Sequence, residues 1–198
     1  MGPMQEIGML VIQTLGSMYL FIVLLRFMLQ VARADFYNPI SQFAIKATNP
    51  VLIPIRRVVP GVFGIDLASI ALALIVHYAV IQLSALVLGA GLINPIHVFI
   101  WALVGLLALA ANLLFWGLLI MVVCSWIAPQ SNHPALMLLR QLVEPVMAPI
   151  RKIIPDMGGM DISPIFAFLA LNVVQILIKA LAQQVGIVGG VSQLVIGI

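Results

Sequence analysis

Long apolar segments alternate with short polar segments along this chain, and four of the apolar segments are long enough to cross a membrane. A bilayer core about 30 Å thick needs about 20 apolar residues of helix at 1.5 Å per residue. The four segments that meet this demand cover residues of about 7–31, 65–88, 97–127 and 162–182. We therefore expect an all-α, polytopic membrane protein with four transmembrane helices.

The composition supports a membrane protein and excludes several other classes. Of the 198 residues, 64% are hydrophobic and only 8% are charged, whereas a soluble domain has about 25% charged residues. This excludes a soluble enzyme, an acidic disordered chain and a secreted disulfide scaffold. The apolar tail at 185–198 is short and contains Gly186, Gly189 and Gly190. We expect it to be an interfacial or packed end, not a fifth span.

An internal repeat is the most specific feature of the sequence. Residues 39–66 align with residues 134–161 at a constant offset of 95 and without a gap. Prolines, an arginine and an aspartate occur at the same positions of both segments, which indicates two copies of one unit. Each unit has a span, a cytoplasmic loop with a short amphipathic helix, and a second span. The first unit covers 1–91 with its loop at 32–64, and the second covers 92–198 with its loop at 128–161.

The two units contain an even number of spans each, so they enter the membrane in the same direction as parallel repeats. Seven of the nine Lys and Arg residues lie in the two loops. Since cytoplasmic loops are enriched in cations, we expect both loops to face the cytoplasm of a bacterial inner membrane and both termini to be periplasmic. The cations form no continuous stripe, so no nucleic acid contact is predicted.

Each loop combines closely spaced prolines with two adjacent cations. An amphipathic stretch of about ten residues precedes Pro50, and the prolines after it should interrupt regular helical hydrogen bonding and bend the chain. The cations are either ordinary cytoplasmic anchors or a contact site for lipid phosphate, another anion or a partner. The loop-shaping prolines are Pro50, Pro54, Pro60, Pro145, Pro149 and Pro155, and the paired cations are Arg56, Arg57, Arg151 and Lys152.

One aspartate precedes the second span in each unit. Asp66 and Asp161 either cap the following helix or form ion pairs with Arg56 and Arg151. Replacement by Asn distinguishes these roles, because Asn also caps a helix but carries no charge.

Polar residues within the spans are few, and they either bind helices together or have a functional role. The candidates are His77, Asn112, Asn172 and Gln175. His77 and Asn172 occupy equivalent repeat positions and are the best candidates for a pair near the membrane midplane. The sequence contains no known catalytic motif and no Cys or His cluster, and Cys124 has no second cysteine to pair with. We therefore predict no catalytic residue, no metal site and no cofactor.

The duplicated Pro-x-x-x-Pro-Ile-Arg-[Arg/Lys]-[Val/Ile]-[Val/Ile]-Pro, with a following Gly-x-Asp, resembles the YggT family, named YlmG in Gram-positive bacteria and plastids. It lies at 50–66 and 145–161, and the resemblance covers nearly the whole chain. It implies a non-enzymatic inner-membrane protein that supports osmotic-stress tolerance or ion homeostasis, by forming or regulating an ion path. The alternative is a lipid-binding scaffold or assembly factor for membrane complexes or division, acting through the cytoplasmic loops. Expected partners are anionic lipid headgroups, and either a membrane protein or a second copy of the chain.

Overall fold

The computed structural model describes residues 2–61, 64–128, 130–154 and 161–198. Four of its helices are long and apolar enough to cross a membrane: α1 (Pro3–Val31), α3 (Leu67–Val87), α4 (Pro95–Ile127) and α6 (Ser163–Gln184). Two further helices, α2 (Pro39–Val58) and α5 (Pro134–Ile153), occupy the two loops, and a short 3₁₀ helix η1 (Gly189–Leu194) lies in the tail. The all-α class with four apolar spans is confirmed.

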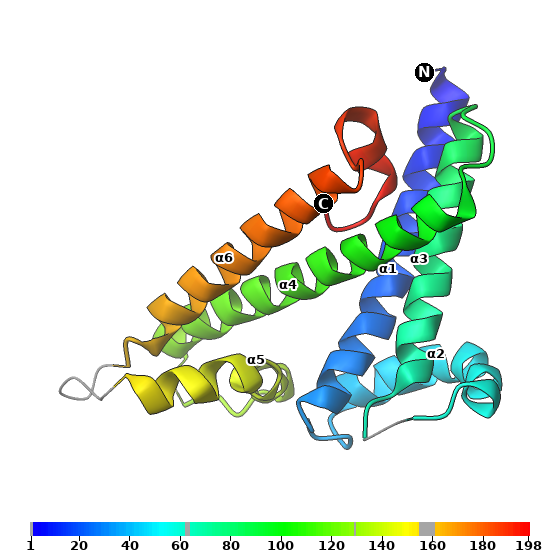
Figure 1. The fold of residues 1–198 in the computed structure, drawn as a ribbon. Helices are drawn as coiled ribbons and strands as arrows, with labels where there is room; N and C mark the ends of the chain where they lie inside the picture. The colour runs from blue at the N-terminus through cyan, green and yellow to red at the C-terminus, as the bar shows by residue number, and fades with distance from the viewer. Residues whose placement is uncertain (1, 62–63, 129, 155–160) are drawn as a thin grey trace.

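The four long helices form two hairpins that correspond to the two repeats. Helix α1 packs against α3, α4 packs against α6, and α3 joins the hairpins through contacts with α4. Figure 1 shows the α4/α6 hairpin inclined to the α1/α3 hairpin, with α2 and α5 lying across the same end of the molecule. The connection 88–94 between the two hairpins and the segment 185–188 between α6 and η1 lie toward the opposite end. This arrangement places the two loop helices at the same end of the spans.

The core beneath each loop helix uses equivalent repeat positions. In the first repeat, Val23, Leu52 and Leu72 are buried in one apolar cluster. Their counterparts at the offset of 95 are buried together in the second repeat, and they are Leu118, Met147 and Ala167. The repeat is therefore present in the packing as well as in the sequence.

The prolines do not interrupt the loop helices, and this part of the sequence prediction is wrong. Helices α2 and α5 each run for 20 residues, through Pro50 and Pro54 in α2 and through Pro145 and Pro149 in α5. In each helix the two prolines are four residues apart, so the missing N–H groups and the freed carbonyls lie on one face. All four prolines are exposed, so that face can be solvated.

Pro60 follows the end of α2 and is exposed, a common position for proline beyond a helix C-terminus. Its counterpart Pro155 lies outside the described residues.

The tail folds back into the angle between the two hairpins (Figure 1). Leu194 and Val195 are buried there against α3 and α4 residues. The contact is close enough that glycine is required on α4: a Cβ atom built on Gly105 would lie 2.3 Å from His77 Cε1 and 2.9 Å from the Ile196 carbonyl oxygen. Tail and bundle thus form one packed unit.

We predict that Gly105→Ala destabilises the protein by about 1–3 kcal/mol, because the added methyl group must displace either His77 or the tail. Gly117→Ala is the matched control, since the nearest atom to its Cβ lies 3.6 Å away and alanine favours the helix. The free energy of unfolding in micelles measures both. Equal effects of the two substitutions would contradict the tight tail contact.

Candidate functional site

Helices α2 and α5 meet at their N-terminal ends. The Asn38 side chain caps α2 by accepting a hydrogen bond from Ile40 N, and its Nδ2 donates to the Pro134 carbonyl oxygen at 2.7 Å. A second contact joins the backbone N–H of Asp35 to Gln141 Oε1 at 3.0 Å. From this contact the two helices extend in opposite directions (Figure 1). The cation pairs at their C-terminal ends therefore form two separate sites, one for each repeat.

The aspartate of the first repeat forms an ion pair rather than a side-chain cap. The Arg56 guanidinium donates from Nη2 to Asp66 Oδ2 and from Nε to Asp66 Oδ1, the latter at 3.4 Å. Ser69 Oγ donates to the same carboxylate at 2.7 Å, and no side-chain cap hydrogen bond is made at the N-terminus of α3. The Asp66 side chain is only 4% exposed. This ion pair joins the C-terminal end of α2 to the start of α3.

The second repeat makes a looser version of the same contact. Arg151 Nε lies 3.3 Å from Asp161 Oδ2, and Arg151 Nη1 donates to Glu144 at 3.0 and 3.1 Å. Asp161 also accepts the backbone N–H of Ser163 at 2.9 Å, so it combines a turn-capping contact with an ion pair. Its side chain is 46% exposed. The two repeats are therefore electrostatically unequal.

Both aspartates have lowered pKa values, for different reasons. Burial raises the pKa of the Asp66 carboxyl, but the hydrogen bonds from Arg56 and Ser69 outweigh burial and hold it below its ordinary value. Hydrogen bonds from Ser163, together with the Arg151 guanidinium, lower the pKa of Asp161 and outweigh burial, which raises it. Each carboxylate is thus held in its charged form.

The second cation of each pair is exposed next to an exposed aliphatic residue. Among the described residues, neither Arg57 nor Lys152 is close enough to a carboxylate for an ion pair. The following residues, Val58 and Ile153, are each 81% exposed. We call these four residues, Arg57, Val58, Lys152 and Ile153, the loop-end surface. It combines positive charge with apolar area in both repeats.

Three of the four predicted intramembrane polar residues lie around the tail. His77 Nε2 accepts the backbone N–H of Ile196 at 3.1 Å, and its Nδ1 donates to the Ala102 carbonyl at 3.1 Å. Asn112 Nδ2 donates to the Gly197 carbonyl at 3.0 Å, and Gln175 Nε2 donates to Asn112 Oδ1 at 3.0 Å. These side chains provide the tail backbone with hydrogen-bond partners that bilayer lipid could not provide.

The midplane pair of His77 and Asn172 is not formed, so that expectation is wrong. Asn172 is exposed and donates to the carbonyl of Phe168 on its own helix at 2.8 Å. The tail occupies the hydrogen-bonding position beside His77. A repeat that matches in sequence therefore need not place equivalent residues against each other.

Sequence reasoning missed two residues that the fold makes important. Gln13 on α1 donates to the carbonyls of Gln193 and Leu194 at 3.2 and 3.4 Å. Arg26 on α1 is buried and hydrogen bonded to α2. The available signal was that Arg26 is the sole charge in the apolar segment 7–31.

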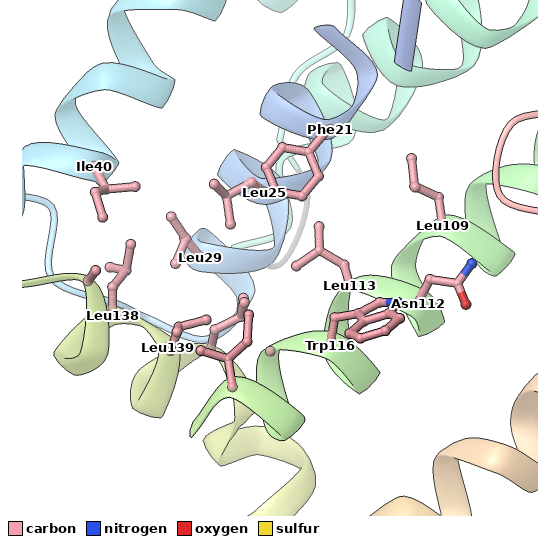
Figure 2. Close-up of a pocket in the computed structure, with 14 residues that line it drawn as sticks. Phe21, Leu25, Leu29, Ile40, Leu109, Asn112, Leu113, Trp116, Leu138 and Leu139 are labelled. Atoms are coloured by element: carbon pink, nitrogen blue, oxygen red, sulfur yellow. The ribbon is translucent and has the colours of Figure 1, made fainter. Parts of the chain in front are cut away.

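A large cavity between the repeats is lined mainly by apolar side chains (Figure 2). It has a volume of about 640 Å³ and lies between α1, α4 and the N-terminal halves of α2 and α5. Asn112 is its polar contributor, beside aromatic residues such as Phe21 and Trp116. Within the described parts of the chain, no group of three or more His, Cys, Asp or Glu side chains could hold a metal ion.

We predict that Asp66→Asn lowers the free energy of unfolding by about 1–3 kcal/mol, because it leaves Arg56 without its buried partner. Asp161→Asn should cost less than about 1 kcal/mol, since that pair is exposed to solvent. Unfolding by SDS titration in mixed micelles measures both. Similar effects of the two substitutions would contradict the difference in burial.

The same pair of variants has a pH signature. Because the pKa of Asp66 is lowered by folding, its contribution is complete above the unfolded value of about 4 and is lost as the pH falls through the lower folded pKa. The wild-type protein should therefore lose stability below about pH 4 more steeply than Asp66→Asn.

Comparison with known proteins agrees with this two-repeat architecture. The model of the CCB3/YggT family matches twice, over residues 5–87 and 100–182. A Pseudomonas aeruginosa protein is 47% identical over 169 residues, which cover 85% of this chain and 86% of that protein. A Vibrio alginolyticus protein is 43% identical over 162 residues, 81% of this chain and 87% of its own length.

YggT of Escherichia coli K12 is 37% identical over 175 residues, 88% of this chain and 90% of its own length. No solved structure matches. Each matched segment contains one membrane hairpin and the loop helix that crosses its end. The chain is a member of the CCB3/YggT family.

Proposed function

We propose that this protein is a non-enzymatic scaffold of the bacterial inner membrane that binds anionic lipid headgroups through its loop-end surface. The observation that carries the proposal is the pairing of an exposed cation with an exposed aliphatic residue, Arg57 with Val58 and Lys152 with Ile153. Both pairs lie at the C-terminal ends of amphipathic helices. An amphipathic helix with cations next to apolar residues is typical of a membrane interface.

Charge supports this function because the neighbouring cations are already neutralised. Arg56 and Arg151 are held by carboxylates of their own repeats. Arg57 and Lys152 are left to act outward, and a cation near an anionic leaflet contributes about 1 kcal/mol. The ion pairs also join the ends of α2 and α5 to the aspartates that precede α3 and α6.

An ion path through the spans receives less support. Among the described residues, the polar side chains His77, Asn112 and Gln175 make hydrogen bonds within the bundle and to the tail. The large cavity between the repeats is lined mainly by apolar side chains. A role in osmotic-stress tolerance or ion homeostasis therefore rests on the family resemblance, and the scaffold function is the one that the loop helices favour.

We predict that the double variant Arg57→Gln with Lys152→Gln weakens binding of phosphatidylglycerol about fivefold per site and leaves phosphatidylcholine binding unchanged. Native mass spectrometry of the protein in detergent with each lipid measures the retained molecules. Lys179→Gln is the control, because Lys179 lies on α6 outside the loop-end surface. A phosphatidylglycerol preference that survives the double substitution would refute the proposal.

The proposal also requires the loop helices to face the cytoplasm. In a Cys124→Ser background, a membrane-impermeant maleimide added to spheroplasts should label Leu92→Cys and not Tyr37→Cys. Both positions are strongly exposed, at 76% and 89%, and they lie in connections at opposite ends of the spans. Labelling of Tyr37→Cys in sealed spheroplasts would reverse the orientation.

A further inference from the structure

Arg26 is a buried cation whose partners are neutral. It lies on α1 and is 7% exposed. Its Nη1 donates to the Asn49 Oδ1 at 2.8 Å, to the Ile45 carbonyl at 3.3 Å and to Thr48 Oγ1. Among the described residues no carboxylate lies within ion-pair distance of it. A buried charge of this kind is costly unless it is compensated.

The charges around Arg26 do not compensate it. The charged side chains that act on Arg26 are Arg56 and Asp66, and these two form an ion pair with each other. The three side chains together therefore carry a net charge of +1 at neutral pH. This region attracts one negative charge.

A small cavity is lined by Arg26 and by Ser41, whose hydroxyl group is unpaired. Ser41 on α2 is 4% exposed, and its Oγ has no hydrogen-bond partner. The cavity has a volume of about 10 Å³, about what one water-sized atom occupies. Its lining residues are Arg26, Leu29, Ala34, Phe36, Ser41 and Ile45. Arg26 and Ser41 thus line the same small space.

The second repeat shows that the fold does not need these polar groups. At the offset of 95, Arg26 corresponds to Met121, Ser41 to Leu136 and Thr48 to Val143. These three positions at the junction of a span with its loop helix are therefore apolar in the other copy, whereas Asn49 corresponds to Glu144, which pairs with Arg151. Packing alone does not account for an arginine and a serine in the first repeat.

We propose that Arg26 and Ser41 form a binding site for a single anionic atom, either a halide ion or one oxygen of a phosphate group. The guanidinium supplies the charge and the Ser41 hydroxyl donates a hydrogen bond. The site lies beneath α2 and is separate from the loop-end surface, so it does not depend on the lipid-binding proposal. Its ligand compensates the buried cation and joins α1 to α2.

The test measures the melting temperature of the delipidated protein in neutral detergent. In one arm sodium bromide replaces sodium gluconate at constant ionic strength. In the other, phosphatidylglycerol is titrated without halide, and the protein and each variant in that arm also carry Arg57→Gln with Lys152→Gln, so that the loop-end surface does not contribute. A ligand that binds the folded state raises the melting temperature with its concentration. We expect a saturable rise with bromide if the source is a free ion, or with phosphatidylglycerol if it is a lipid phosphate.

Arg26→Met, which copies the second repeat, should abolish the rise. Ser41→Ala keeps the cation and should weaken the apparent affinity about tenfold, so the test holds even where Arg26→Met does not fold. The Arg57→Gln with Lys152→Gln variant should keep the full response to bromide. A response that is absent in the wild type, as expected for a site filled by water, overturns the proposal. So does a response that is equal in the wild type and Ser41→Ala.

Discussion

A bilayer offers no hydrogen-bond partners, so the backbone polar groups that this chain buries need partners within the protein. The tail shows the consequence most directly. Its backbone enters the angle between the hairpins, and side chains of α1, α3 and α4 supply partners: Gln13, His77 and Asn112. The same constraint explains why Pro50 and Pro54 keep their freed carbonyls on an exposed face of α2. The loop helices can therefore contain prolines that a membrane-buried helix face could not tolerate.

The two repeats share a core and differ in their charges. Val23, Leu52 and Leu72 in one copy correspond to buried residues in the other, because the packing of a loop helix on its hairpin is the same. The charged contacts diverge: Asp66 is buried with Arg56, whereas Arg151 bridges two exposed carboxylates. In the part of the chain that the structure describes, only the first copy has a buried arginine and an unpaired serine that line one cavity. The two copies therefore share their apolar packing and differ at their polar positions.

The two proposed sites, the loop-end surface and the Arg26 site, use different charged groups. The ion pairs occupy Arg56 and Arg151 and leave the proposed loop-end surface facing outward, while the proposed Arg26 site lies between α1 and α2. A phosphate-bearing lipid has the chemistry to engage either one, but through different atoms: exposed cations at the surface, and a buried guanidinium with a hydroxyl in the interior. The first repeat is thus the more strongly charged half of the junction between spans and loop helices.

The sequence alone determined the four spans, the duplication and the family, because apolar length and a repeat in register are local properties of the chain. It also identified both aspartates, the paired cations and His77, Asn112 and Gln175 as special. Only the tertiary structure decided what they contact. In the folded chain Asp66 forms an ion pair and makes no side-chain cap. The loop helices continue through Pro50 and Pro145, and the tail, not Asn172, binds His77. Arg26 is also buried under α2. These outcomes depend on which groups the folded chain brings within hydrogen-bond distance and which faces it leaves in water, and no local pattern encodes that.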